Sequence, residues 1–279
     1  MAHPISVNSA SSASSSPPST PNTGLGPPKV GGLLVNGEDL ATKEGVHGPI
    51  IRLQNIVIGY ESEDPLVKIP NLEISPGEIV AIAGPSGVGK TTLLRTIAGL
   101  VKPLSGTVEV CGKVNPTLPS RGEVGYVPQR LGLIRHASVM HNVMLGANAG
   151  HKPYWYFPPS SIAKENALEA ISSMGLMDKI GEPVRRLSGG QQRRVATART
   201  LAQSPKLIMA DEFLSELDEE TMQTVLGSVV DYVRSSGAAL LVVEHDISRA
   251  KSMADRLLVI DDGRVNPFIT ETTAMEVKV

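Results

Sequence analysis

The sequence has one cysteine, few aromatic residues and no long hydrophobic run. Cys111 is the only cysteine among 279 residues, which excludes an intramolecular disulfide and argues against a metal site built from cysteines. Aromatic residues make up 3% of the chain, so the core must consist mainly of leucine, isoleucine, valine and alanine. The longest apolar runs, such as residues 237–243 and 79–83, fall well short of the roughly 18 residues of a membrane span. We therefore expect that the chain does not cross a bilayer and that any membrane role depends on a partner protein.

The chain also has no strong excess of charge of either sign. Its 26 lysine and arginine residues and 28 aspartate and glutamate residues give a formal net charge of −2. A nucleic-acid-binding domain is usually basic, so the composition does not indicate nucleic acid as the main partner. The hydrophobic fraction of 41% and the charged fraction of 19% are typical of a globular protein, and the length fits one main domain with an appendage.

Residues 1–48 differ from the rest of the chain in composition. They are rich in serine, proline and glycine and have almost no periodic apolar pattern, so they cannot bury enough surface to offset the entropy of ordering. We predict a disordered tail here. The segment lacks the apolar stretch of a secretory signal. An organelle transit peptide remains an alternative because serine is abundant, although arginine is absent.

From residue 49 onward, apolar segments of strand length alternate with segments of helical spacing. Such alternation predicts a parallel sheet with helices on its faces, and ligands bind at the carboxyl ends of the strands in sheets of this kind. We expect one domain over residues 49–265, a mainly helical part at about 130–187 with a loop at 152–159, and a short C-terminal tail at 266–279. Strands are expected at 50–60, 67–74, 78–83, 106–110, 124–128, 207–210, 239–244 and 257–260, and helices at 91–100, 138–145, 162–174, 188–203, 219–234 and 247–254.

A glycine-rich loop connects the expected strand at 78–83 to the expected helix at 91–100. Glycines let backbone N–H groups converge on phosphate oxygens, and the start of a helix adds unpaired N–H groups and a positive dipole end. Lys90 supplies a positive charge for the outer phosphates, and the hydroxyl of Thr91 is placed to reach Mg²⁺. A glycine-rich turn that matched by chance would lack this strand–loop–helix context. The loop reads Gly84-Pro85-Ser86-Gly87-Val88-Gly89-Lys90-Thr91-Thr92 and matches the phosphate-binding pattern G-x-x-x-x-G-K-[ST].

Two adjacent acids, Asp211 and Glu212, follow the apolar strand at 207–210. An acid at a strand end beside a phosphate loop can hold the water shell of Mg²⁺, which is the role expected of Asp211. Glu212 would then polarise the attacking water, and a base in such a position contributes about 10²–10⁴-fold in rate. A solvated acidic loop is the alternative for an Asp-Glu pair alone, and the preceding apolar strand favours the functional interpretation.

The motif Leu187-Ser188-Gly189-Gly190-Gln191, which begins a basic helix, resembles the signature of the ABC ATPase family. The resemblance covers about residues 50–265, and other motifs follow in the family's order. Tyr60 alone would be interpreted as a packing residue, and Gln129 alone would carry no information. In the family's order, Tyr60 matches the aromatic residue that stacks on adenine, Gln129 the Q-loop glutamine, residues 215–218 the D-loop and His245 the switch histidine.

This resemblance implies an α/β fold of the P-loop NTPase type, with a mainly parallel sheet flanked by helices, an N-terminal antiparallel β part and an inserted helical subdomain. It also implies ATP and Mg²⁺ as ligands and a dimer in which the signature of one copy completes the phosphate site of the other. Glu212 and His245 would be catalytic, and Thr91, Gln129 and Asp211 would hold the metal. Nucleotide contacts would come from Tyr60, Gly84, Pro85, Ser86, Gly87, Val88, Gly89, Lys90, Thr91, Thr92, Ser188, Gly189, Gly190, Gln191 and Asp218.

One residue departs from the family pattern. Phe213 follows the expected catalytic glutamate, where the family usually has proline. Both acids are present, so ATP hydrolysis is still expected. The loop between Glu212 and Asp218 is predicted to be less rigid than in the family.

Transport is the function that the motifs favour. The sequence has neither the long coiled coil of DNA-repair ABC ATPases nor the second P-loop of translation factors, and it keeps the signature from which iron–sulfur assembly ATPases usually depart. The expected partners are transmembrane permease subunits, a second copy of the chain and a solute-binding protein, at the cytoplasmic face of the cell membrane and without nucleic acid.

The transported substrate is indicated only by short features. The Pro153-Tyr154-Trp155 insert and the Ala210-Asp211-Glu212 trio resemble importers of phosphonate or phosphate, and we favour uptake of a small anion of this kind. The trio also occurs in lipoprotein-release exporters. An export-type ATPase and a soluble iron–sulfur assembly ATPase therefore remain the alternatives.

Overall fold

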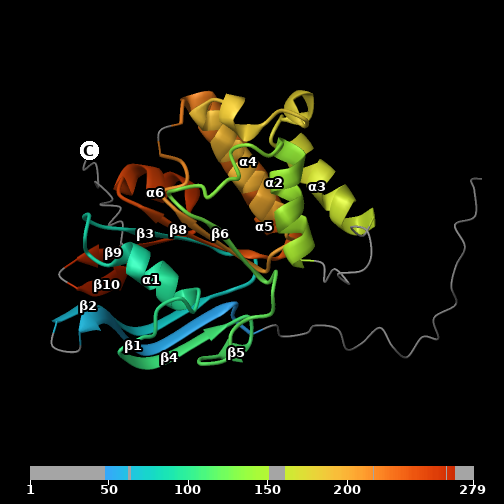
Figure 1. Ribbon diagram of the computed structural model, residues 1–279. Coiled ribbons are helices and arrows are strands. Elements are labelled where there is room, and N and C mark those ends of the chain that lie inside the picture. The colour runs from blue at the N-terminus through green and yellow to red at the C-terminus, as the bar shows by residue number, and fades with distance from the viewer. Residues whose placement is uncertain (1–47, 62–63, 151–160, 216, 262, 268–279) are drawn as a thin grey trace, which may run out of the picture. The chain divides into compact units, whose positions relative to one another are not determined.

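A computed structural model describes residues 48–61, 64–150, 161–215, 217–261 and 263–267 (Figure 1). The predicted tail up to residue 47, the loop predicted at 152–159 and residues 268–279 lie outside the described residues. The side chain of Tyr60 lies outside them as well. In the described part of the chain, no helix has the length and apolar character that a membrane crossing needs.

The described strands form one sheet of ten, in the order β5-β4-β1-β2-β10-β9-β3-β8-β7-β6. Strands β9, β3, β8, β7 and β6 run parallel, whereas β5, β4, β1 and β2 pair antiparallel. Strand β10 joins the two parts, because it pairs with β9 on one side and with β2 on the other. This arrangement confirms the predicted fold class. The bounds are β1 Ile51–Glu61, β2 Asp64–Ile74, β3 Ile79–Ala83, β4 Ser105–Val110, β5 Lys113–Val114, β6 Val124–Val127, β7 Leu207–Asp211, β8 Ala239–Glu244, β9 Arg256–Asp261 and β10 Arg264–Pro267.

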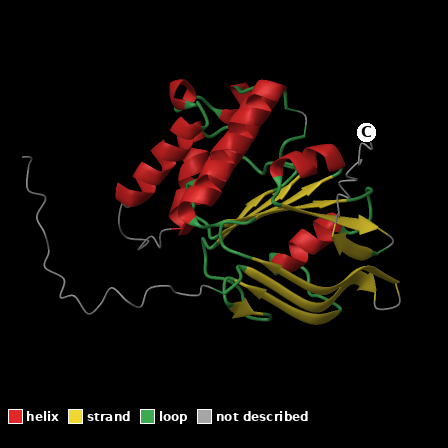
Figure 2. Cartoon of the chain, turned by 180° about the vertical axis from the view of Figure 1, so that it is seen from behind, coloured by secondary structure: helices red, strands yellow, loops and turns green. Residues whose placement is uncertain are grey.

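Helix α1 (Lys90–Ile97) lies between the antiparallel and the parallel parts of the sheet (Figures 1 and 2). Its residues Leu93, Leu94 and Ile97 belong to one buried cluster with side chains from β1 and β8. Strands β3, β7 and β8 are buried along their whole length, because α1 covers one face and helices from later in the chain cover the other. Their nearly uninterrupted apolar sequences follow from this two-sided burial.

The other face of the parallel strands packs against a second group of helices (Figure 2). These are α2 (Val139–Gly150), α3 (Ser161–Ser173), α4 (Gly189–Leu201), α5 (Glu219–Ser236) and α6 (Ile247–Met253), with two short 3-10 helices at Met177–Lys179 and Val184–Arg186. The predicted limits of the domain and of its helical subdomain stay predictions.

The segment just before α2 is a loop, in which the side chain of Asn142 hydrogen-bonds both backbone groups of Ile134. Strand β10 was not predicted, and it extends past residue 265, because Asn266 and Pro267 pair with β9. The two-residue strand β5 was not predicted, since it is too short to show a pattern.

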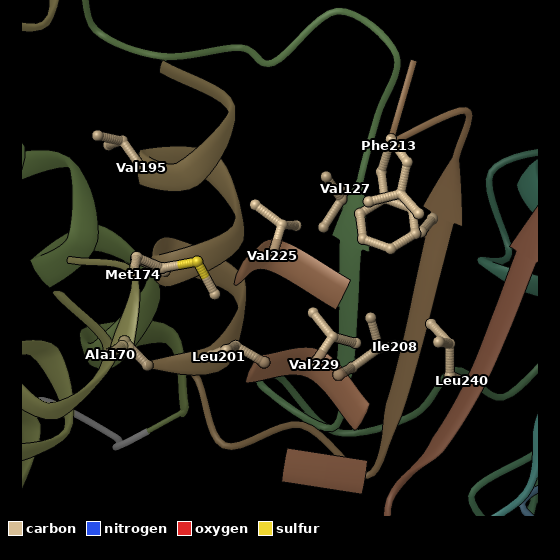
Figure 3. Close-up of a cluster of buried hydrophobic side chains, with 14 of the residues drawn as sticks. Val127, Ala170, Met174, Val195, Leu201, Ile208, Phe213, Val225, Val229 and Leu240 are labelled. Atoms are coloured by element: carbon tan, nitrogen blue, oxygen red, sulfur yellow. The ribbon is translucent and has the colours of Figure 1, made fainter. Parts of the chain in front are cut away.

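A second buried cluster lies between the parallel strands and this second group of helices, and Phe213 is one of its largest side chains, with 1% of its surface exposed. Figure 3 shows its ring in the cluster that also contains Val127 and Val225, which come from β6 and α5. Leu214 is buried to the same extent. The first two residues after Glu212 are therefore held by the core.

Replacing Phe213 with alanine should lower the free energy of unfolding by about 3–5 kcal/mol, because a ring-sized cavity would open in the core. Urea denaturation measures this loss. Leu100→Ala is the control, because 70% of Leu100 is exposed and its truncation should change stability by no more than about 0.5 kcal/mol. Equal stability of Phe213→Ala and the wild type would contradict the packing described here.

Candidate functional site

The loop after β3 adopts backbone angles that require glycine at defined positions. Gly84 has a φ of 154°, and a Cβ there would lie 2.5 Å from the carbonyl oxygen of Ile260. Gly89 has a φ of 104°, and a Cβ there would lie 2.9 Å from a methyl group of Val67. Only glycine fits such positions. The loop can therefore lie close against the sheet while its tip, Pro85 to Gly87, stays exposed.

Lys90 lies over this loop with 6% of its surface exposed. Its Nζ donates hydrogen bonds to the carbonyl oxygens of Gly84 and Pro85, at 2.7 and 2.8 Å. Burial lowers the pKa of Lys90, and the nearby carboxylates of Glu212 and Asp211 act in the opposite direction. The ammonium group is thus held where the loop can present it to an anion.

Thr91 and Asp211 come together although 120 residues separate them. The Thr91 hydroxyl donates to Asp211 Oδ2 at 3.0 Å, and the hydroxyl of Tyr126 donates to the same oxygen at 3.4 Å. Burial raises the pKa of Asp211, and the two hydroxyl groups partly offset this by stabilising the carboxylate. Burial also raises the pKa of Tyr126 to about 12, so this hydroxyl stays protonated. Tyr126 was not among the predicted site residues, because no pattern in the sequence links it to Asp211.

Glu212 is the centre of a second group of side chains. Gln129 Nε2 donates to Glu212 Oε2 at 2.9 Å, and His245 Nδ1 lies 4.0 Å from Oε1. The φ of Glu212 is 49°, which is a strained conformation for a residue with a side chain. The amide and the hydroxyl of Ser215 both donate to the Glu212 carbonyl oxygen, at 3.1 and 2.7 Å, and hold the turn.

The signature residues form the start of α4. Ser188 is the N-cap and forms a capping box with Gln191, because each side chain accepts a hydrogen bond from the other's backbone N–H. A Cβ on Gly189 would meet nothing within 4 Å, and a Cβ on Gly190 would lie 3.5 Å or more from its nearest neighbours. The described fold therefore does not require glycine at these two positions.

Asp218 has a structural role in addition to any contact with nucleotide. Its carboxylate caps α5 by accepting hydrogen bonds from the backbone N–H and the hydroxyl of Thr221, at 2.9 and 2.8 Å. These bonds lower the pKa of Asp218. The predicted nucleotide contact of Asp218 stays a prediction, as does that of Tyr60.

Glu244 is a buried carboxylate that sequence reasoning did not identify as functional. It ends β8 directly before His245, it is fully buried, and neither of its oxygens has a hydrogen-bond partner among the described residues. Burial raises its pKa to about 7. Arg249 of α6 lies nearby, with its NH1 3.9 Å from Glu244 Oε2. In the sequence, the position of this glutamate at the end of an apolar strand was the only feature that could have identified it.

Comparisons with known proteins agree with this geometry. Residues 67–215, more than half of the chain, match the ABC transporter family. The phosphonates import ATP-binding protein of Escherichia coli (strain UTI89) is 34% identical over 232 residues, a match that covers 77% of this chain and 87% of that protein. The L-cystine transport system ATP-binding protein of Escherichia coli (strain K12) is 37% identical, with 77% and 88% covered.

This chain matches only part of the length of a further relative. The hypophosphite import ATP-binding protein of Stutzerimonas stutzeri is 35% identical over 224 residues, but the match spans only 65% of that protein's length. Among solved structures, a dimeric ATP-binding cassette in a post-hydrolysis state, bound to ADP and Pi, has a TM-score of 0.68 and 32% identity. That match covers 77% of this chain and 96% of the cassette.

These matches agree with the phosphate loop that carries Lys90 and with the acid pair at the end of β7. The chain therefore belongs to the ABC transporter family and is an ATP-binding, ATP-hydrolysing cassette.

Proposed function

We propose that this cassette drives the import of a small phosphorus oxyanion, such as phosphonate or phosphate, through separate membrane subunits. The ATPase part of the proposal rests on one observation above all, which is that Glu212 lies between Gln129 and His245 at the edge that also carries Lys90. The import part is supported by the similar phosphonate and hypophosphite import proteins. These relatives favour import over the lipoprotein-release and iron–sulfur alternatives.

The residues at this edge fit a nucleotide together with Mg²⁺. Among the described residues, no group of three or more histidine, cysteine or acidic side chains is placed to hold a metal ion. Mg²⁺ suits such a site, because it is usually held by one or two carboxylates, water and phosphate oxygens. The paired oxygens of Thr91 and Asp211 would serve as its ligands, with Gln129 as a third. When bound, the ion would offset negative charge on the phosphates.

The chain's own residues supply the remaining chemistry. The Lys90 ammonium would exchange its two loop carbonyls for the outer phosphate oxygens of ATP. Glu212 would accept the proton of the attacking water. Gln129 and His245 face its two different carboxylate oxygens and would hold the carboxylate in position. The buried ring of Phe213 anchors this turn to the core.

The glycines of the signature support a composite site. Glycine costs about 1 kcal/mol relative to alanine inside a helix, yet Gly189 and Gly190 stand in the first turn of α4. The described fold does not require glycine at these two positions. We therefore infer that side chains are absent here because a ligand from another molecule approaches the backbone closely. A helix N-terminus binds anions well, so the γ-phosphate of an ATP held by a second copy of the chain fits this position.

The remaining partners follow from the proposed role. Transmembrane permease subunits would be bound in trans, with a solute-binding protein delivering the substrate, and the cassette would lie at the cytoplasmic face of the cell membrane. We include no nucleic acid, because a net charge of −2 provides no basic surface excess.

Glu212→Gln should bind ATP but hydrolyse it about 10²–10⁴-fold more slowly, because the amide keeps the shape of the carboxylate and cannot accept a proton. ATP should then accumulate in a stable dimer, which size-exclusion chromatography detects. Glu220→Gln, on the exposed first turn of α5, is the matched control and should behave as the wild type. Undiminished turnover in Glu212→Gln would assign the base to another residue, with His245 as the first candidate.

The substrate class is tested with the membrane protein that co-purifies with the chain. In a complex reconstituted with its solute-binding protein, phosphonate or phosphate should stimulate ATP hydrolysis, because an importer couples the ATPase to the loaded binding protein. Cystine serves as the comparison ligand, since a cystine transport protein is similarly related to the chain. Stimulation by cystine or by a lipoprotein, without stimulation by phosphorus oxyanions, would contradict the proposed substrate.

A further inference from the structure

Arg193 is a buried arginine on α4, two residues after the last residue of the signature, Gln191. Its exposed fraction is 6%, whereas the next residue, Arg194, is half-buried. A guanidinium group is costly to bury unless its N–H groups find acceptors. The partners of Arg193 therefore indicate why a charged residue is present at this position.

The guanidinium bridges two loops that lie at the ends of different strands. NH1 donates to the carbonyl oxygen of Gln129, which follows β6, and NH2 donates to the carbonyl oxygen of Ser215, which follows β7. Both distances are 3.5 Å, and the acceptors lie 64 and 22 residues away in the sequence. Arginine suits this geometry, because its donors form a rigid planar fork that can hold two acceptors at a fixed separation.

Both bridged loops hold Glu212. The side chain of Gln129 donates to the Glu212 carboxylate at 2.9 Å, so it fixes the reacting end of the residue. The amide and the hydroxyl of Ser215 donate to the Glu212 carbonyl oxygen, so they fix its strained backbone. One side chain of α4 therefore supports the proposed base from both sides.

We propose that Arg193 is a positioning residue that couples the signature end of α4 to Glu212 of the same chain. The inference rests on the proposed composite site, in which the signature receives the nucleotide of a second copy. A shift of α4 on that event would be transmitted by the guanidinium to the Gln129 and Ser215 loops together. Nucleotide binding in one site of the dimer would then change the position of Glu212 in the other site.

Arg194 provides a matched control on the same helix turn. Its NH1 donates at 3.0 Å to the carbonyl oxygen of Met174, which follows α3 and belongs to neither of the bridged loops. Arg193→Gln, Arg193→Lys and Arg194→Gln are compared with the wild type for ATP hydrolysis, ATP affinity and thermal unfolding. Lysine keeps the charge but cannot donate to both carbonyls in the same way.

Arg193→Gln should lower kcat roughly 10- to 100-fold, as a small displacement of a reacting group does. Its affinity for ATP should change by no more than about twofold, since the phosphate loop is untouched, and the Hill coefficient of hydrolysis should fall toward unity. Arg193→Lys should recover part of kcat. Arg194→Gln should keep the wild-type kcat and Hill coefficient.

A wild-type kcat and Hill coefficient in Arg193→Gln would overturn the inference while leaving the proposed function intact. An equal loss of kcat in Arg194→Gln, or a loss of kcat that follows a matching fall in thermal stability, would also overturn it, because either would show a merely structural role. A wild-type chain that does not hydrolyse ATP would overturn the proposed function and the coupling with it.

Discussion

The parallel pairing of β3, β8 and β7 is the constraint on which the site depends. In this register Ala83 lies beside Glu244, and Val243 lies beside Asp211. The phosphate loop, the acid pair and His245 therefore leave the sheet at the same edge, although they are far apart in the sequence. Because all three strands are fully buried, their ends cannot shift without disturbing both hydrophobic clusters. The core thus fixes the distances on which phosphate binding and proton transfer depend.

The charges at this edge are consistent with the proposed Mg²⁺ site. Asp211, Glu212 and Glu244 are carboxylates near the ammonium group of Lys90, and each of them raises the pKa of Lys90. Burial raises the pKa of Asp211 and of Glu244, which means that the folded protein disfavours their charged forms. An anionic nucleotide would add to this negative charge. Mg²⁺ at Thr91 and Asp211 would offset it, and Arg249 already does so for Glu244 on the α6 side.

The elements whose pattern is local could be predicted from the sequence. The strands at the centre of the sheet are continuous apolar runs, and the phosphate loop has a fixed spacing of glycines, lysine and threonine. What could not be predicted depends on contacts between distant segments. In the sequence, Arg193 is one of several basic residues on a helix. Its contacts with Gln129 and Ser215 become visible only in the fold. Tyr126 gives no sign of its contact with Asp211, and the loop before α2 is set by Asn142.

In the proposed dimer, the phosphate loop of one copy and the signature of the other copy form one site. Measuring ATP hydrolysis of Lys90→Ala, of Gly190→Asp and of their mixture tests this arrangement. Each variant alone has two broken sites, because alanine removes the ammonium and aspartate sets a side chain and a negative charge against the γ-phosphate. In a mixed dimer one intact site is rebuilt, so the mixture should hydrolyse more ATP than either variant alone. If Gly190→Asp alone hydrolyses ATP at the wild-type rate, with a specific activity that does not change on dilution, the site is contained in one chain and the proposed dimer mechanism is wrong.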